Sequence, residues 1–137
     1  MNDKQLKAKR ALITGATGYI GSNLTRHLLT EGWIVDVVVR PSSKCKLLDV
    51  VRGSITIHYH DGTSIGMASI LSTTKPDVVF HLASLILAQH TIDDIEGLIK
   101  SNLLFSTQLV DAMSCLLYTS DAADDLLCVD LGGRRII

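Results

Sequence analysis

The chain has 137 residues, of which 47% are hydrophobic and 20% are charged, and its formal net charge is −1. This length predicts one domain with enough apolar content for a packed core, which excludes wholesale disorder. The near-neutral charge argues against a nucleic-acid partner. No apolar run is long enough to span a membrane. The polar first ten residues, MNDKQLKAKR, are unlike a secretory signal.

Apolar runs alternate with helical patterns along the chain. Short runs of apolar and β-branched residues predict buried strands at 9–14, 33–39, 54–58 and 78–83. Apolar residues at helical spacing predict helices at 22–31, 44–51, 64–72 and 92–113. This order predicts an α/β fold, a Rossmann-like doubly wound parallel sheet that is truncated after its fourth strand and the following helix.

Three glycines separate the first strand from the first helix. In such a loop, the first glycine, Gly15, permits a tight turn, and the second, Gly18, lets a pyrophosphate approach the backbone. The third, Gly21, lets the helix pack close to the strand. Because the loop lies between a strand and a helix, the spacing predicts a dinucleotide-binding site.

Residues 14–21, TGATGYIG, resemble the TGxxGxxG loop of the extended short-chain dehydrogenases/reductases, the NAD-dependent epimerase/dehydratase family. The resemblance continues at Asp61-Gly62, at residues 77–84 (DVVFHLAS, similar to DVVxHLAA), and at Asn102 and Thr107, and covers about residues 8–114. Together with Arg40, considered below, it implies a set of cofactor-binding residues: Gly15, Thr17, Gly18, Tyr19, Ile20, Gly21, Arg40, Asp61, Gly62, Leu82, Ala83 and Ser84.

The resemblance implies an enzyme that transfers a hydride at a carbon of a nucleotide-diphospho-sugar, as a reductase, an epimerase or a dehydratase. The start without a secretory signal and the cysteine spacing predict a cytoplasmic protein, and a homodimer of the full-length enzyme is left open. The family uses a Tyr-x-x-x-Lys pair as acid and base, but the fourth residue after each of Tyr19, Tyr59 and Tyr118 is not a lysine. We therefore name no catalytic residue and expect this chain alone to be inactive.

Two other functions remain open. A non-catalytic dinucleotide-binding regulator can share this fold, because fold does not determine function. A reductase of non-sugar ketones would also fit the segment Val39-Arg40-Pro41. Residues downstream of Ser114 in the full-length protein would distinguish these functions.

The end of the second strand indicates which nicotinamide cofactor binds. NAD-binding chains usually carry an acidic residue there for the ribose 2′-hydroxyl, but this position is Val39, followed by Arg40. Asp36 is acidic but lies three residues too early, inside the strand. Arg40 suits a 2′-phosphate, so we predict NADP, with NAD as the alternative.

The remaining candidate groups predict no metal site. His58 and His60 have no evident third ligand, and the three cysteines have neither metal-ligand nor disulfide spacing. His81 is predicted to be a packed structural residue. Ser84 has two open roles, in the cofactor cleft or as a cap.

The end of the chain is similar to translated sequencing adapter. Residues 115–124 match a transposase-end sequence read in one frame, and residues 129–137 match a flow-cell primer in the same frame. We therefore divide the chain into a dinucleotide-binding part, 1–114, and a non-native tail, 115–137. The alternative is a natural tail that contains Gly132-Gly133.

This interpretation makes a prediction about the source DNA. Long reads across codon 114, obtained without transposase adapters, should continue into a fifth strand and a Tyr-x-x-x-Lys motif. Genomic DNA that encodes residues 115–137 and then stops would contradict the adapter interpretation and favour a short cofactor-binding protein without dehydrogenase chemistry.

Overall fold

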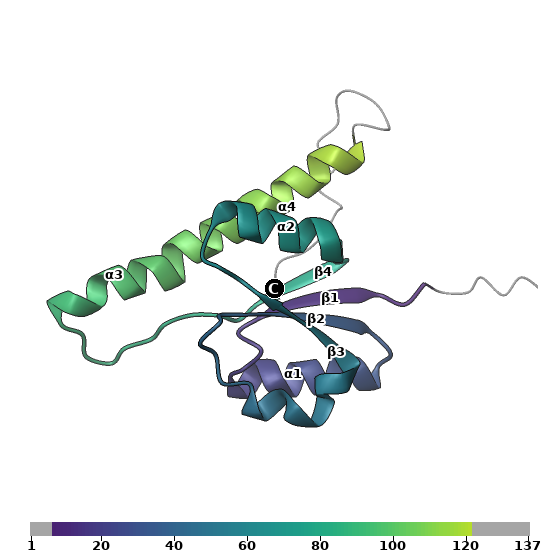
Figure 1. Cartoon of the computed structure of the whole chain (residues 1–137), viewed down its shortest axis with the longest axis horizontal. Coiled ribbons are helices and arrows are strands. Elements are labelled where there is room, and N and C mark those ends of the chain that lie inside the picture. The colour runs from purple at the N-terminus through teal and green to yellow at the C-terminus, as the bar shows by residue number, and fades with distance from the viewer. Residues whose placement is uncertain (1–6, 122–137) are drawn as a thin grey trace, which may run out of the picture.

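The computed structural model describes residues 7–121, and its strands form one parallel sheet (Figure 1). The strands are β1 (Arg10–Thr14), β2 (Ile34–Val39), β3 (Ile55–Tyr59) and β4 (Val78–His81). Their order in the sheet is β3-β2-β1-β4, so β1 pairs with both β2 and β4. The chain thus crosses from one side of β1 to the other between β3 and β4, and the predicted Rossmann-like α/β fold is confirmed.

Helices cover both faces of the sheet (Figure 1). One face carries α1 (Tyr19–Thr30) and a 3₁₀ helix at Lys46–Ser54, and the other carries α2 (Ser64–Thr74) and α4 (Phe105–Asp121). Successive side chains of β1 alternate between these layers, as in any strand. Leu12 therefore packs in the α2/α4 core, whereas Ile13 packs in the α1 core.

Several element ends differ from the prediction by one to three residues, and two of these differences have a clear local reason. The first helix begins at Tyr19 because Gly18 is already extended and its carbonyl accepts the Ser22 N–H at 2.9 Å. β4 ends at His81, two residues before the predicted end, because its partner β1 stops at Thr14, where the backbone turns away at Gly15. Leu82 and Ala83 consequently lie in the loop beyond the sheet.

The predicted helix 92–113 is built from several pieces. A 3₁₀ turn at Ile92–Asp94 leads into α3 (Ile95–Leu98), a π-helical segment (Ile99–Leu104) and α4. Helical periodicity does not distinguish these helix types, so the single predicted helix is correct only in outline. π-helical turns are often found at functional sites, which directs attention to Ile99–Leu104.

Asp36 is buried inside β2, as predicted. Its carboxylate accepts a hydrogen bond from Arg10 Nε at 2.7 Å and lies 2.7 Å from His58 Nε2. The side chain is 1% exposed, so these two partners compensate the cost of removing its charge from water. Asp36 therefore cannot bind a ribose at the strand end.

The proposed tail is only partly described. α4 continues to Asp121, and residues 122–137 lie outside the described part of the chain, so the division at residue 114 stays a prediction. Within residues 7–121, no helix has the length and apolar character needed to cross a membrane.

Candidate functional site

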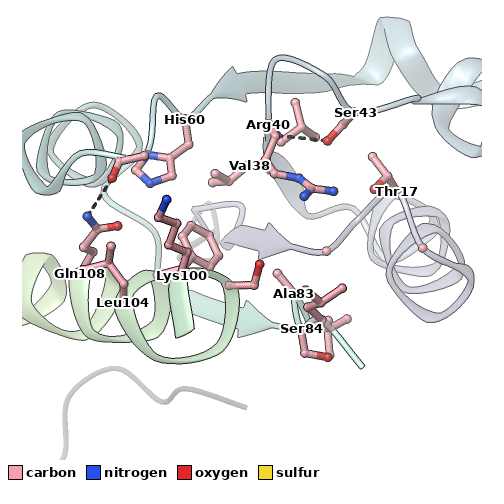
Figure 2. A pocket seen from close by; sticks show the side chains of 18 of the residues that line it. Thr17, Val38, Arg40, Ser43, His60, Ala83, Ser84, Lys100, Leu104 and Gln108 are labelled. Atoms are coloured by element: carbon pink, nitrogen blue, oxygen red, sulfur yellow. Dashed lines mark hydrogen bonds between the residues drawn. The ribbon is translucent and has the colours of Figure 1, made fainter. Parts of the chain in front are cut away.

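A cavity of about 710 Å³ opens at the carboxyl ends of the strands (Figure 2). Its walls come from the glycine loop, the end of β2, the loops after β3 and β4, and the helical stretch from α3 to α4. Most of the predicted site residues line it: Gly15, Thr17, Gly18, Arg40, Gly62, Leu82, Ala83 and Ser84. Tyr19, Ile20, Gly21 and Asp61 are not part of the lining.

The three glycines have different surroundings. Gly15 has φ +73°, and a Cβ there would lie 2.6 Å from Ala83 N. A Cβ on Gly21 would overlap the Gly15 carbonyl oxygen. The space beside Gly18 is larger, because the nearest atom to a Cβ added there would be Gly15 O, at 3.4 Å. Gly15 and Gly21 are thus needed for packing, whereas Gly18 leaves space on the cavity side.

The start of α1 can receive an anion. No side chain caps the helix and its first turn holds no acidic residue, so the positive end of the helix dipole faces an uncompensated site. The side chains of Tyr19 and Ile20 are 81% and 69% exposed. Because neither residue lines the cavity, we expect any contribution of Tyr19 and Ile20 to a phosphate to come from their backbone N–H groups.

Arg40 places a guanidinium at the mouth of the cavity. The Arg40 N–H donates to Ser43 Oγ at 3.2 Å and the Ser43 N–H donates to Arg40 O at 2.9 Å, which closes a turn after β2. Figure 2 shows the guanidinium between Val38 and Thr17 in the view. It makes no hydrogen bond or ion pair with another described residue, so it remains available to a ligand.

The loop after β3 is held by its own side chains. Asp61 Oδ1 accepts hydrogen bonds from the Thr63 N–H at 2.9 Å and the Thr63 hydroxyl at 2.8 Å. These bonds, the backbone one first, hold the pKa of Asp61 below its usual value, so the carboxylate is ionised. Gly62 O accepts from Gln108 Nε2 at 2.9 Å. Asp61 therefore orients the loop, and Gly62 lines the cavity.

A chain of hydrogen bonds links β1, β4 and α4. The Ser106 hydroxyl donates to the Asn102 carbonyl at 2.9 Å, so at its 2.8 Å contact with His81 Nε2 it accepts. His81 Nδ1 must then accept from the Thr14 hydroxyl at 2.7 Å, and Thr14 Oγ1 accepts the Ala83 N–H at 3.3 Å. The geometry places His81 in a structural role as a neutral imidazole.

Asn102 supports the loop after β4 in a similar way. Its Oδ1 accepts the Leu85 N–H at 2.7 Å and its Nδ2 donates to Leu85 O at 2.8 Å. Ser84, just before this clamp, lines the cavity and caps no described helix. This placement favours the cleft role over the cap role for Ser84.

Sequence reasoning missed the cavity residues from the distal helices and from the end of β3. Lys100 and Leu104 of the π-helical segment, Phe105 and Gln108 of α4, and His60 all line the cavity. Their contribution depends on how the helix docks, which no local motif encodes. Within residues 7–121, no group of three or more His, Cys, Asp or Glu side chains is placed to hold a metal ion.

Comparison with known families decides the classification. A model described as "NAD dependent epimerase/dehydratase family" matches residues 11–122. The chain belongs to this family. The match confirms the predicted family, and the family's NAD dependence agrees with a nucleotide-binding site at the glycine loop.

Two of the curated relatives are sugar-nucleotide enzymes by name. The chain is 44% identical over 81 residues to the GDP-mannose 4,6-dehydratase sdnI of Sordaria araneosa, which covers 57% of this chain and 15% of that protein. It is 30% identical over 106 residues to the UDP-glucose 4-epimerase of Mycolicibacterium smegmatis, which covers 75% of this chain and 34% of that protein. The chain therefore spans about a third or less of these two family members.

Solved structures agree with this classification. The UDP-glucose 4-epimerase of Thermotoga maritima, solved with UDP-glucose, has a TM-score of 0.66 at 28% identity and covers 75% of this chain and 33% of its own. The Thermus thermophilus UDP-glucose 4-epimerase, solved with NAD, has a TM-score of 0.67 at 26% identity. The match covers 80% of this chain and 34% of the epimerase chain. These neighbours give no support to NADP as the main cofactor.

Burial gives His81 a testable pH behaviour. Desolvation lowers the pKa of His81 below 6.5, the value expected in the unfolded chain. The stability that the neutral His81 ring contributes to the fold should be complete above pH 6.5. It should decrease as the pH falls below 6.5, because the unfolded chain then binds a proton that the folded chain resists. An NMR titration of the His81 ring should give a pKa below 6.5. In the variant His81→Gln, Tm should fall less as the pH is lowered, because the titrating imidazole is gone. A ring pKa at or above 6.5 would contradict the desolvation of the His81 ring.

Proposed function

We propose that this chain forms the dinucleotide-binding part of an enzyme that transfers a hydride at a sugar carbon of a nucleotide-diphospho-sugar. The observation that carries the proposal is the glycine cradle: Gly15 and Gly21 hold the loop closely packed, while Gly18 faces open space beside an uncapped helix start. Such a cradle fits a pyrophosphate group, which is large, anionic and hydrogen-bonded mainly by backbone N–H groups. In this proposal, residues 1–114 form the dinucleotide-binding part.

The cavity walls suggest how the dinucleotide would lie. Its pyrophosphate would rest between Gly15 and Gly18, with backbone N–H groups at Tyr19 and Ile20 nearby. One ribose would meet the end of β2 at Arg40, and the nicotinamide half would extend along Leu82–Ser84. The nicotinamide, when bound, supplies the hydride-accepting or hydride-donating carbon, and this chain's residues bind and orient it.

Sugar nucleotides are favoured as substrates over the two alternative functions because both curated relatives above are named as enzymes of GDP-mannose or UDP-glucose. Residues 1–137 contain no Tyr-x-x-x-Lys pair, so the acid and base for hydride transfer would come from the remainder of the full-length protein. This chain by itself should bind the dinucleotide without turnover. A cytoplasmic location and a homodimeric full-length enzyme belong to the same proposal.

Gly18→Ala tests the cradle. The added methyl group meets only Gly15 O, at an ordinary contact distance of 3.4 Å, so the fold should tolerate it. It would occupy the space of the pyrophosphate and should raise the dinucleotide Kd about tenfold or more, about 1.4 kcal/mol, with little change in Tm. Calorimetric titration with NAD and NADP measures this change. Gly53→Ala is the control, because a Cβ at Gly53 has no neighbour within 4 Å and Gly53 lies outside the cavity. Equal affinity of Gly18→Ala and the wild-type chain would count against the cradle.

Arg40 leads us to propose NADP rather than NAD as the preferred cofactor. Its guanidinium and the Ser43 hydroxyl line the ribose end of the cavity, and a guanidinium–phosphate hydrogen bond is charge-assisted. Arg40→Ala should therefore weaken NADP binding about tenfold to a hundredfold and leave NAD binding nearly unchanged. Parallel titrations with both dinucleotides give the ratio. A wild-type chain that binds NAD more tightly than NADP would overturn this preference and leave the dinucleotide site in place.

A further inference from the structure

The Lys, Arg, Asp and Glu side chains that line the cavity are all of one sign. Arg40 and Lys100 belong to its lining, and within residues 7–121 no Asp or Glu does. The whole chain has a formal net charge of −1, so this positive lining does not follow from composition. A cleft lined by one sign of charge attracts ligands of the opposite sign. The proposed function assigns a role to Arg40 and none to Lys100.

Lys100 reaches the cavity from the helical stretch between α3 and α4. The residues of this stretch that line the cavity are spaced three or four apart or adjacent, which places them on one helix face: Gly97, Lys100, Ser101, Leu104, Phe105 and Gln108. Lys100 is the one charged residue among these six. It belongs to the π-helical segment, a helix type often found at functional sites. Figure 2 shows its side chain extending from the helix into the cavity.

The ion pair that Lys100 forms within the folded chain is weak. Lys100 Nζ lies 3.7 Å from Glu96 Oε2, which is too far for a good hydrogen bond. The two side chains are 70% and 87% exposed. Exposed ion pairs contribute little to stability, because water screens the charges and two long side chains must be ordered. The ammonium group of Lys100 can therefore leave Glu96 for a ligand at small cost.

The chemistry of an ammonium group indicates which part of the dinucleotide Lys100 would contact. The only anionic groups of the dinucleotide are phosphates: a pyrophosphate in both NAD and NADP, and a 2′-phosphate in NADP alone. A lysine carries a compact charge with three donors on a flexible four-carbon stem. It therefore binds phosphate as a point charge, without the fixed geometry of a guanidinium. A lysine at the cavity wall thus matches a phosphate oxygen better than any uncharged part of the ligand.

We propose that Lys100 exchanges its contact with Glu96 for a phosphate group of the bound dinucleotide. Lys100 then holds the anionic part of the ligand from the helical wall, while Arg40 holds it from the end of β2. The inference rests on the proposed function and adds a binding residue to the same site. It explains why a single cation stands on a helix face that is otherwise uncharged and turned toward the cavity.

The test titrates the full 137-residue chain and its Lys100→Met variant with NAD and with NADP. Lys100→Met keeps an unbranched side chain and removes the charge, so it should weaken binding about threefold to tenfold. Its ligand-free Tm should stay that of the wild-type chain, because the side chain is exposed. Equal weakening of both dinucleotides identifies the pyrophosphate as the group bound, and weakening of NADP alone identifies the 2′-phosphate. Lys100→Arg keeps the cation and should keep most of the affinity.

Controls separate the possible failures. Lys46→Met removes the same charge from an exposed position outside the cavity and should bind both dinucleotides as the wild-type chain does. Raising the ionic strength should reduce the difference between Lys100→Met and the wild-type chain, because salt screens an exposed charge. Unchanged affinity in Lys100→Met, or an equal loss in Lys46→Met, would overturn the role of Lys100 and leave the dinucleotide site intact. No binding of either dinucleotide by the wild-type chain would overturn both proposals.

Discussion

The close approach of the first loop to the backbone beyond β4 is the contact on which the rest of the site depends. Gly15 sits at φ +73° with Ala83 N and Leu82 C so near that a Cβ would lie 2.6 Å from each. The backbone bend at Gly15 ends β1 at Thr14. Because β4 pairs with β1, the pairing of β4 ends at the facing residue, His81. One glycine thus brings the glycine loop and the end of β4 together, and the cavity opens where these two segments of the chain separate.

Hydrogen bonds then hold the walls that this contact creates. The chain from Ala83 through Thr14 and His81 to Ser106 ties the loop after β4 to α4. Gln108, on the same helix, ties α4 to the loop after β3 through Gly62 O. Two sides of the cavity are therefore fastened to one helix, so the site is shaped before any ligand arrives and less ordering is required on binding.

The sequence predicts the parts of this site that are local. Glycine spacing in residues 15–21 and the apolar runs around it are enough to predict the loop, the first helix and the parallel sheet. Asp36 could also be placed inside its strand by counting. The places of His60 and Gln108 in the cavity wall were not predictable in the same way, because they depend on how α4 packs over the ends of strands that are distant in the sequence. The π-helical segment is invisible for a different reason, since its apolar pattern matches that of an α-helix.

Several departures from good local chemistry lie around one cavity, while another, the left-handed backbone of Lys75 (φ 43°) at the end of α2, lies away from it. Elsewhere in the described chain, buried polar groups such as Asp36 have partners on neighbouring strands. Around the cavity, Gly15 adopts a positive φ, α1 begins without a side-chain cap, Arg40 has no ion-pair partner and His60 has two unpaired nitrogens. Proteins that fold consistently tend to break local rules where they bind or react. In the proposed function, two of these departures would be relieved by one ligand, through a pyrophosphate at the loop and a 2′-phosphate at Arg40. The proposed NADP would supply both groups.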